Sequence, residues 1–325
     1  MKLARPFIRL PFSFDAQQLE REANQFSADK WMAHPSRMSG NSALALVSVN
    51  GEDNDRFAGP MMETPHLQQC PYIRQIMGHF DEVIARSRLM QLAPGAEVSP
   101  HVDFNYHWYN RVRIHIPIVT QPEVTFYCGE DSVHMQPGEC WIFDSWRRHR
   151  VTNQSSETRI HLVIDTAGSG KFWQRVRRME QLENKDVQTE LVPFQIGQST
   201  EIRTEKYNVS PVMAPGEMEA MIDELILDFS ENRNNSNDLI DRYTDILRSL
   251  AKDWRAIWLE YGWEYSALPK YEALLSQTVR QFHPEKRALV SNSNDVGINP
   301  IIMQRIVRAA LFREELPRFT NQIDN

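Results

Sequence analysis

Between residues 84 and 165 the chain repeats one pattern: short runs rich in Ile, Val, Tyr and Phe, separated by turn residues. Several runs alternate apolar with polar residues at a period of two, which is typical of half-buried strands. The residues at 94–95, 129–131 and 137–138 combine Pro, Gly, Glu and Asp, which favours tight turns. Strands at roughly ten-residue spacing predict an antiparallel sandwich or jelly roll. The predicted strands are 84–92, 112–119, 123–128, 140–143 and 158–165.

Helical patterns flank these strands on both sides. Residues 15–33 and 67–86 are expected to be helices packed on one outer sheet face. Later in the chain, the segments 217–230 and 238–261 each place apolar residues at helical spacing on one stripe, and a third helix is predicted at 300–313. We interpret the Met and Trp residues of these stripes as helical core rather than as a ligand groove.

A chain of 325 residues is long enough for two domains. The predicted fold class is mainly β: a double-stranded β-helix (jelly roll, cupin-like) core flanked by helices, followed by an all-α C-terminal domain. The jelly-roll domain is expected at 1–180 and the helical domain at 216–325. Residues 181–215, with several prolines and many polar residues, are expected to form the linker between them.

The charge balance argues against some classes of partner. The 43 acidic residues exceed the 36 basic ones and give a net charge of -7, so no nucleic-acid or membrane partner is expected. No run approaches the roughly 18 apolar residues of a membrane span, and the first residues lack the continuous apolar core of a signal peptide. Three cysteines, an odd number, suggest a reducing compartment. We therefore expect a cytoplasmic protein; the oligomeric state is left open.

Histidine and aspartate stand at a spacing that suggests a metal site. His101 and Asp103 are two residues apart in an extended run, so their side chains point to the same face of a strand. His149, which follows a predicted strand entry at 137–138, is the best candidate for a third ligand. Two imidazoles and one carboxylate form the facial triad of iron(II) oxygenases, which leaves three positions open for a co-substrate and dioxygen. The alternative is that His101 is an ordinary surface residue.

Arg159 follows His149 at a spacing that suggests a partner for a carboxylate. If the two residues lie on the arms of a hairpin centred on Gln154, their side chains face each other across the ladder, ~5 Å apart at Cβ. An arginine there can hold, through two parallel hydrogen bonds, a carboxylate whose other end chelates the metal. Binding of 2-oxoglutarate requires this arrangement. The alternative is an ion pair of Arg159 with Glu157 or Asp165.

A second strand carries polar residues that could reach the same site. Arg113 and His115 alternate along the predicted strand and therefore share one face. Polar groups that face the interior of a barrel need an anionic partner, because unpaired buried charge is costly. Arg113 is expected to bind 2-oxoglutarate or the carboxylate of an amino-acid substrate. A salt bridge with Asp103, Asp144 or Glu139 is the alternative.

Residues 88–165 resemble the catalytic core of the aspartyl/asparaginyl β-hydroxylases, a family of iron(II)- and 2-oxoglutarate-dependent dioxygenases. The resemblance implies that His101, Asp103 and His149 bind Fe(II). It also implies that Arg159 binds 2-oxoglutarate, with Arg113 and His115 close by, and that O2 is the second co-substrate. The matching segments are PGAEVSPHVD at 94–103, RVRIHIPI at 111–118, PGECWIFD at 137–144, RRHRV at 147–151 and RIHLVID at 159–165.

Within this family the chain is similar to the bacterial free-proline hydroxylases. It shares with them ARSR at 85–88, the carboxylate of Asp103 and a helical C-terminal extension. The animal peptide-acting branch has glycine in place of this carboxylate and serine in place of Met90. Both differences argue against hydroxylation of Asp or Asn residues in peptides.

The expected function is hydroxylation of an unactivated C–H bond of an amino acid, free or carrier-bound, with succinate and CO2 as co-products. Two alternatives remain open. One is a hydroxylase of Asp, Asn or another side chain in a protein, and the other is a non-catalytic cupin-like protein that binds a metal or an anion. Residues 106–109, just after the proposed ligands, are expected to form either a substrate lid or a hydrophobic cap.

Overall fold

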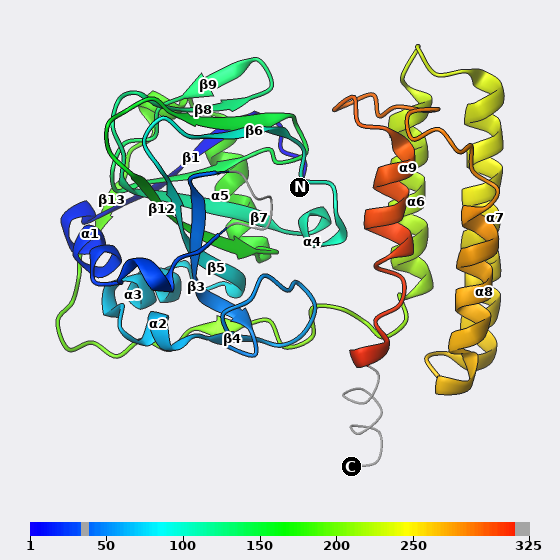
Figure 1. The fold of residues 1–325 in the computed structure, drawn as a ribbon, viewed down its shortest axis with the longest axis horizontal. Helices are drawn as coiled ribbons and strands as arrows, with labels where there is room; N and C mark the ends of the chain where they lie inside the picture. Colours follow the sequence, from blue (N-terminus) through cyan, green and yellow to red (C-terminus); the bar gives the residue numbers. More distant parts are fainter. Residues whose placement is uncertain (34–38, 316–325) are drawn as a thin grey trace. The chain divides into compact units, whose positions relative to one another are not determined.

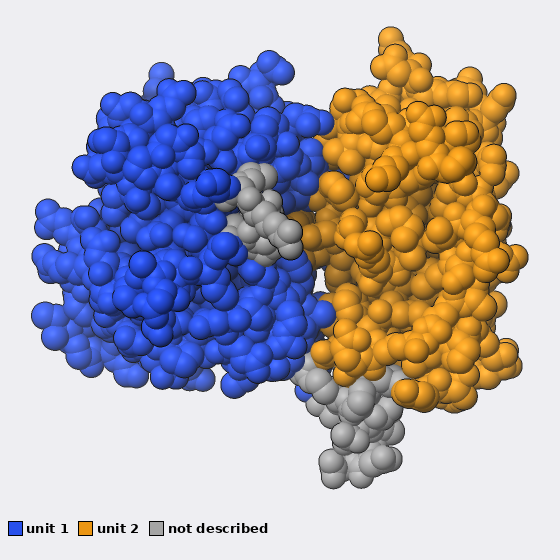
Figure 2. Space-filling view, in the orientation of Figure 1, with its two compact units in different colours: residues 1–103, 110–208 blue, residues 104–109, 209–325 orange. Residues whose placement is uncertain are grey.

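The computed structural model describes residues 1–33 and 39–315, which form two compact units (Figure 2). The chain leaves unit 1 directly after Asp103, passes through unit 2 and returns to unit 1 at Asn110. Unit 1 consists of residues 1–103 and 110–208, and unit 2 of residues 104–109 and 209–325.

Unit 1 is built on a large, mostly antiparallel sheet, which contains ten strands within the described part of the chain (Figure 1). We call it the major sheet. Its central strands are buried along most of their length, as expected for runs rich in β-branched residues. In sheet order the strands are β13 (Glu190–Val192), β1 (Phe7–Phe14), β10 (Glu139–Phe143), β7 (Val112–Val119), β12 (Arg159–Thr166), β5 (Val83–Leu92), β3 (Asn41–Val49) and β2 (Met32–Ala33), with β4 (Met61–Glu63) beside β3 and β14 (Arg203–Thr204) beside β5.

A second, four-stranded antiparallel sheet packs on one face of the major sheet and completes a β sandwich. This minor sheet runs in the order β6 (Glu97–His101), β11 (His149–Asn153), β8 (Val124–Cys128) and β9 (Asp131–Val133). Apolar residues of both sheets form one buried cluster, in which Phe126 of β8 lies against Phe7 of β1 and Phe143 of β10. The predicted candidate ligands lie on strands of this sandwich or next to them.

Helices cover the other face of the major sheet: α1 (Ala16–Asn24), α2 (Pro65–Gln68), α3 (Pro71–Phe80) and α5 (Gly170–Glu180) (Figure 1). Asp15 and Ser169 cap α1 and α5 by accepting hydrogen bonds from backbone N–H groups of the first turn. Leu19, Ile76 and Phe172 are among the side chains that these helices bury against the sheet. Two short 3-10 helices, Ala28–Lys30 and Asn184–Asp186, complete the regular structure of unit 1 within the described residues.

Unit 2 is helical. Met218, Met221 and Phe229 are buried, as is Trp254, whose Nε1 donates a hydrogen bond to the carbonyl of Met213 at 2.8 Å. The interpretation of these Met and Trp stripes as core is therefore confirmed. The helices are α4 (Tyr106–Tyr109), α6 (Pro215–Ser230), α7 (Asn237–Tyr261), α8 (Leu268–Val279), α9 (Ile298–Ile301), the π-helix Ile302–Val307 and the 3-10 helices Tyr265–Ala267 and Arg313–Glu315. In the described part of the chain, none of the helices is long and apolar enough to cross a bilayer.

The mainly β description holds only for the core of unit 1. Of the described residues, 36% are helical and 26% lie in strands, so the chain as a whole is mixed α and β. The predicted helices at 15–33 and 67–86 are shorter than expected, and the helix predicted at 300–313 starts earlier and turns into a π-helix at Ile302. In the segment 181–215, strands β13 and β14 pair in parallel with β1 and β5 of the major sheet.

Candidate metal centre

The structure brings His101, Asp103 and His149 together at one end of the minor sheet. His101 ends β6 and His149 begins β11, and the two are directly opposite each other in the antiparallel ladder. Their ring centroids are 4.2 Å apart. Asp103 has Oδ1 at 4.0 Å from Nε2 of His101 and Oδ2 at 3.8 Å from Nε2 of His149. One ligand atom of each residue lies within 4.8 Å of the other two.

Both imidazoles are oriented by the same local interaction. Nδ1 of His101 is 2.8 Å from the carbonyl oxygen of Ser99, and Nδ1 of His149 is 2.9 Å from that of Arg147. A carbonyl oxygen only accepts, so we assign the proton of each neutral ring to Nδ1, which leaves the lone pair on Nε2. In both residues Nε2 is the nitrogen nearer to Asp103.

These three groups fit a divalent metal ion. Burial lowers the pKa of His149 to about 4, so this ring is neutral and able to bind a cation at ordinary pH. The side chain of His149 is 4% exposed, whereas those of His101 and Asp103 are 38% and 20% exposed, so the group is closed on one side and open on another. Two imidazoles and a carboxylate form the donor set of non-haem iron(II) sites with free coordination positions.

The predicted hairpin pairing of His149 with Arg159 is wrong. β11 pairs with β6 and β8 in the minor sheet, whereas β12, which begins at Arg159, pairs with β5 and β7 in the major sheet. The turn between them carries the chain from one sheet to the other. Arg159 is therefore placed on the sheet that packs against the metal ligands, and not beside His149 on the same ladder.

Arg159 is a buried cation that has no carboxylate partner among the described residues. Its side chain is 5% exposed, its Nε has no hydrogen-bond partner, and burial lowers its pKa to about 9. Glu157 instead accepts a hydrogen bond from Gln121, and Asp165 accepts from Arg113. The alternative of an ion pair between Arg159 and either of these acids is therefore wrong.

Two buried histidines lie near Arg159, between the sheets. His115 packs edge-on against Phe126 and Phe143, and its ring centroid is 5.9 Å from that of His161. Both nitrogens of each ring lack a hydrogen-bond partner among residues 1–33 and 39–315. Burial lowers the pKa of both histidines well below the ordinary value, so both rings are neutral. His161 is a residue that the sequence reasoning did not single out.

Arg113 forms an ion pair with a partner that was not predicted for it. Its Nε and Nη2 donate to the two carboxylate oxygens of Asp165 at 2.8 and 3.3 Å. Burial disfavours the charged form, but the ion pair outweighs this and raises the pKa of Arg113. The hydrogen-bonded partner is thus Asp165, and not Asp103, Asp144 or Glu139 as the alternative had it; the charge of Asp103 acts on Arg113 as a smaller influence.

Two more arginines of β5 lie on the same face. Arg86 places Nε at 3.7 Å from Asp165 and its guanidinium over the ring of Phe57. Arg88, 3% exposed, donates from Nη1 to Oδ1 of Asp55 at 2.8 Å. Burial is the main cause that lowers the pKa of Arg88 to about 10, and the positive charge of Arg113 lowers it further. Nearby carboxylates, including that of the candidate ligand Asp103, act in the opposite direction. Arginine side chains therefore lie within electrostatic range of the triad.

Residues 106–109, expected to form a lid or a cap, pack inside unit 2. Oη of Tyr106 donates to Oε1 of Glu217 at 2.6 Å, and the guanidinium of Arg305 lies 4.8 Å from the ring centroid of Tyr109. His107 and Trp108 are both 4% exposed. The expectation that residues 106–109 form a substrate lid or a hydrophobic cap stays a prediction.

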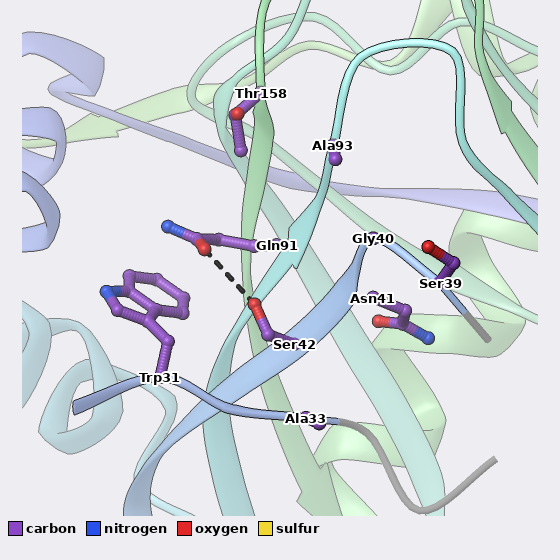
Figure 3. A pocket seen from close by; sticks show the side chains of 9 residues that line it. All are labelled: Trp31, Ala33, Ser39, Gly40, Asn41, Ser42, Gln91, Ala93 and Thr158. Carbon is purple, nitrogen blue, oxygen red and sulfur yellow. Dashed lines mark hydrogen bonds between the residues drawn. The ribbon is translucent and has the colours of Figure 1, made fainter. Parts of the chain in front are cut away.

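A surface pocket of about 490 Å³ lies elsewhere in unit 1 (Figure 3). Its two facing polar groups satisfy each other, because Oγ of Ser42 donates to Oε1 of Gln91 at 3.1 Å. No charged side chain and none of the predicted ligands lines it. The lining residues are Trp31, Ala33, Ser39, Gly40, Asn41, Ser42, Gln91, Ala93 and Thr158.

The sequence profile of the aspartyl/asparaginyl β-hydroxylase family matches residues 16–168, which contain the whole triad and Arg159. Residues 16–168 belong to that family. The chain is also similar to two bacterial enzymes. An L-proline cis-3-hydroxylase of Streptomyces sp is 29% identical over 169 residues, which is 47% of this chain and 53% of that protein. An L-proline cis-4-hydroxylase of Rhizobium meliloti (strain 1021) is 26% identical over 124 residues, 38% of this chain and 44% of that protein.

The chain thus spans about half the length of the curated relatives it matches. Among solved structures, an oxidoreductase of the 2OG-Fe(II) oxygenase family from Burkholderia pseudomallei is similar to 51% of this chain. The match covers 86% of that protein, with a TM-score of 0.38 and 14% sequence identity.

Proposed function

We propose that the chain is an Fe(II)- and 2-oxoglutarate-dependent hydroxylase that acts on a small amino acid. The observation that carries this proposal is the convergence of His101, Asp103 and His149, with both rings held so that Nε2 is free for a metal. The β sandwich is, in this proposal, a jelly-roll dioxygenase domain of a cytoplasmic protein. A helical domain follows after the segment 181–215.

The protein's part in the reaction is binding and orientation. His101, Asp103 and His149 would hold the iron and leave part of its surroundings open to other ligands. When bound, iron supplies the activation of O2 that is coupled to conversion of 2-oxoglutarate into succinate and CO2. The burial of His149 against Phe143, with ring centroids 4.8 Å apart, keeps water away from one side of the site.

Arg159 is the residue best suited to bind the far carboxylate of 2-oxoglutarate. It is a buried guanidinium without an anionic partner, and a carboxylate offers two oxygens that match its fork of donors. His115 lies near enough to both Arg159 and His149 for their charges to affect its pKa, although burial is the main influence. It is therefore placed to contact a co-substrate that extends from the metal to Arg159.

The charges of the β5 and β7 arginines support a substrate that carries a carboxylate. Arg86 and Arg113 both lie beside the carboxylate of Asp165. Arg88 is paired with Asp55, whose side chain is 29% exposed. The matched relatives act, by their names, on L-proline, which carries a carboxylate. Free L-proline is therefore the first substrate to test.

The test is a screen of free amino acids with anaerobically prepared protein, Fe(II) and 2-oxoglutarate, in which succinate and hydroxylated product are followed after O2 is admitted. The proposal predicts that one small amino acid raises succinate formation and is hydroxylated in equal amount. Product from a peptide and from no free amino acid would favour the protein-hydroxylase alternative. Metal binding without any consumption of 2-oxoglutarate would favour a non-catalytic binding protein.

A further inference from the structure

Next to Arg159 the sandwich buries polar atoms that the proposed function does not yet use. Within the described part of the chain, His161 is 1% exposed and neither of its ring nitrogens has a hydrogen-bond partner. Thr120 is 8% exposed, and its Oγ1 also has no partner among those residues. Together with Nε of Arg159, these are four buried polar atoms without hydrogen bonds. Leaving such atoms unsatisfied costs about 1–3 kcal/mol each, so a group of them points to a ligand that binds there.

The strand register places these residues together. Arg159 and His161 are two apart on β12, which pairs with β5 without a break at this point, so both side chains lie on one face. Ile160 of β12 is paired with Val119 of β7, and in this antiparallel register Thr120 is at the level of Arg159. The positive charge of Arg159 also contributes, after burial, to the low pKa of His161, as expected for close neighbours.

The chemistry of the group selects a carboxylate. Arg159 supplies one positive charge and a planar set of donors, while a neutral imidazole and a hydroxyl each supply one further donor. The two oxygens of one carboxylate can accept hydrogen bonds from all three of these side chains. A second buried anion would find no second cation here, because Arg113 and Arg88 are already paired with Asp165 and Asp55.

We propose that His161 and Thr120 complete the binding site for the far carboxylate of 2-oxoglutarate, with Arg159 as its cation. This inference rests on the proposed function and adds two positioning residues to it. The side chains fix the carboxylate from β12 and β7 and thereby set the distance between it and the metal ligands. They touch only the end of the co-substrate that does not react.

Isothermal titration of 2-oxoglutarate into the full chain loaded with Mn(II) tests the proposal without turnover. His161→Leu is expected to weaken binding by about 10- to 100-fold, since it removes a hydrogen bond to a charged group, and Thr120→Val by about 3- to 10-fold. His161→Gln retains a side-chain N–H and should lose less affinity than His161→Leu. His79→Gln, on helix α3 at the opposite face of the sheet, is the matched control and should bind as the wild type does.

Far-UV circular dichroism shows whether each variant is folded, and its Mn(II) affinity shows whether the triad is intact. If His161→Leu fails to fold, the affinities of His161→Gln and Thr120→Val for 2-oxoglutarate test the inference instead. Wild-type affinity in both His161→Gln and Thr120→Val would overturn the inference while leaving the proposed function intact. Failure of the wild-type protein to bind 2-oxoglutarate with Mn(II) would overturn the proposed function itself.

Discussion

Replacing Arg159 with methionine is expected to stabilise the ligand-free protein. The side chain is 5% exposed, and burial lowers its pKa to about 9. At about 1.4 kcal/mol for each unit of pKa, the charged form is disfavoured in the folded state by on the order of 4–5 kcal/mol. The unfolded chain keeps the charge in water up to a higher pH. The cost therefore acts at every pH below about 9 and fades only as the pH rises above that value.

Methionine keeps much of the length of the arginine side chain and carries no charge. Some of the gain is lost because methionine fills less space, so we expect a net increase of about 2–3 kcal/mol in the free energy of unfolding. At about 2–4 °C for each kcal/mol, the melting temperature rises by several degrees. The assay is thermal unfolding at pH 7.5 at one constant concentration of Mn(II), with and without 2-oxoglutarate. Ligand at 100 times its Kd stabilises the wild type by about 2.7 kcal/mol, and the variant should not respond.

Arg113→Met is the matched comparison, because Arg113 is also largely buried but is paired with Asp165. Its loss leaves a carboxylate that is 1% exposed without its closest partner, which should destabilise the protein by about 3–5 kcal/mol. The two substitutions should therefore change the melting temperature of the ligand-free protein in opposite directions. If both lower it alike, Arg159 is not an uncompensated charge, and the reasoning that assigns it to 2-oxoglutarate is refuted.

Three further substitutions test other parts of the structure. Asp103→Ala should abolish tight Mn(II) binding, followed by electron paramagnetic resonance, without a change in circular dichroism; retained binding would exclude Asp103 as a ligand. Asp55→Ala should lower the free energy of unfolding, measured in urea, by about 1–3 kcal/mol because it leaves Arg88 buried without its partner; an unchanged urea midpoint would show that the pair contributes nothing. Trp254→Ala should cost about 3–5 kcal/mol, since Trp254 is fully buried and hydrogen-bonded to Met213; a loss below 1 kcal/mol would contradict its place in the helical core.

Local signals were enough to predict much of the core and the group of candidate ligands. Alternation of apolar and polar residues marks strands such as β7, and the observed strand coincides with the predicted one. His101 and Asp103 lie close together because a spacing of two residues keeps both side chains on one side of an extended chain. Helix α7, with its long apolar stripe, lies within one residue of the predicted bounds at each end.

The rest depends on how distant strands are ordered, which periodicity does not encode. His149 and Arg159 are near in sequence, but the turn between them changes sheets, so a hairpin was the wrong expectation. Asp165 reaches Arg113 because β12 lies beside β7, with the two residues directly paired. Strand β1 was missed since Pro11 interrupts its alternation.

The most direct test of the central claim is the coupling of 2-oxoglutarate turnover to product formation at the triad. Purified protein would be supplied with Fe(II), 2-oxoglutarate, O2 and the amino acid found by the screen, and succinate and hydroxylated product would be quantified together. We predict equal amounts of the two from the wild-type protein and neither from His149→Ala, which removes the buried, backbone-oriented ligand. Equal formation of hydroxylated product by His149→Ala and the wild type would contradict the account, because the reaction would then not depend on the metal centre described.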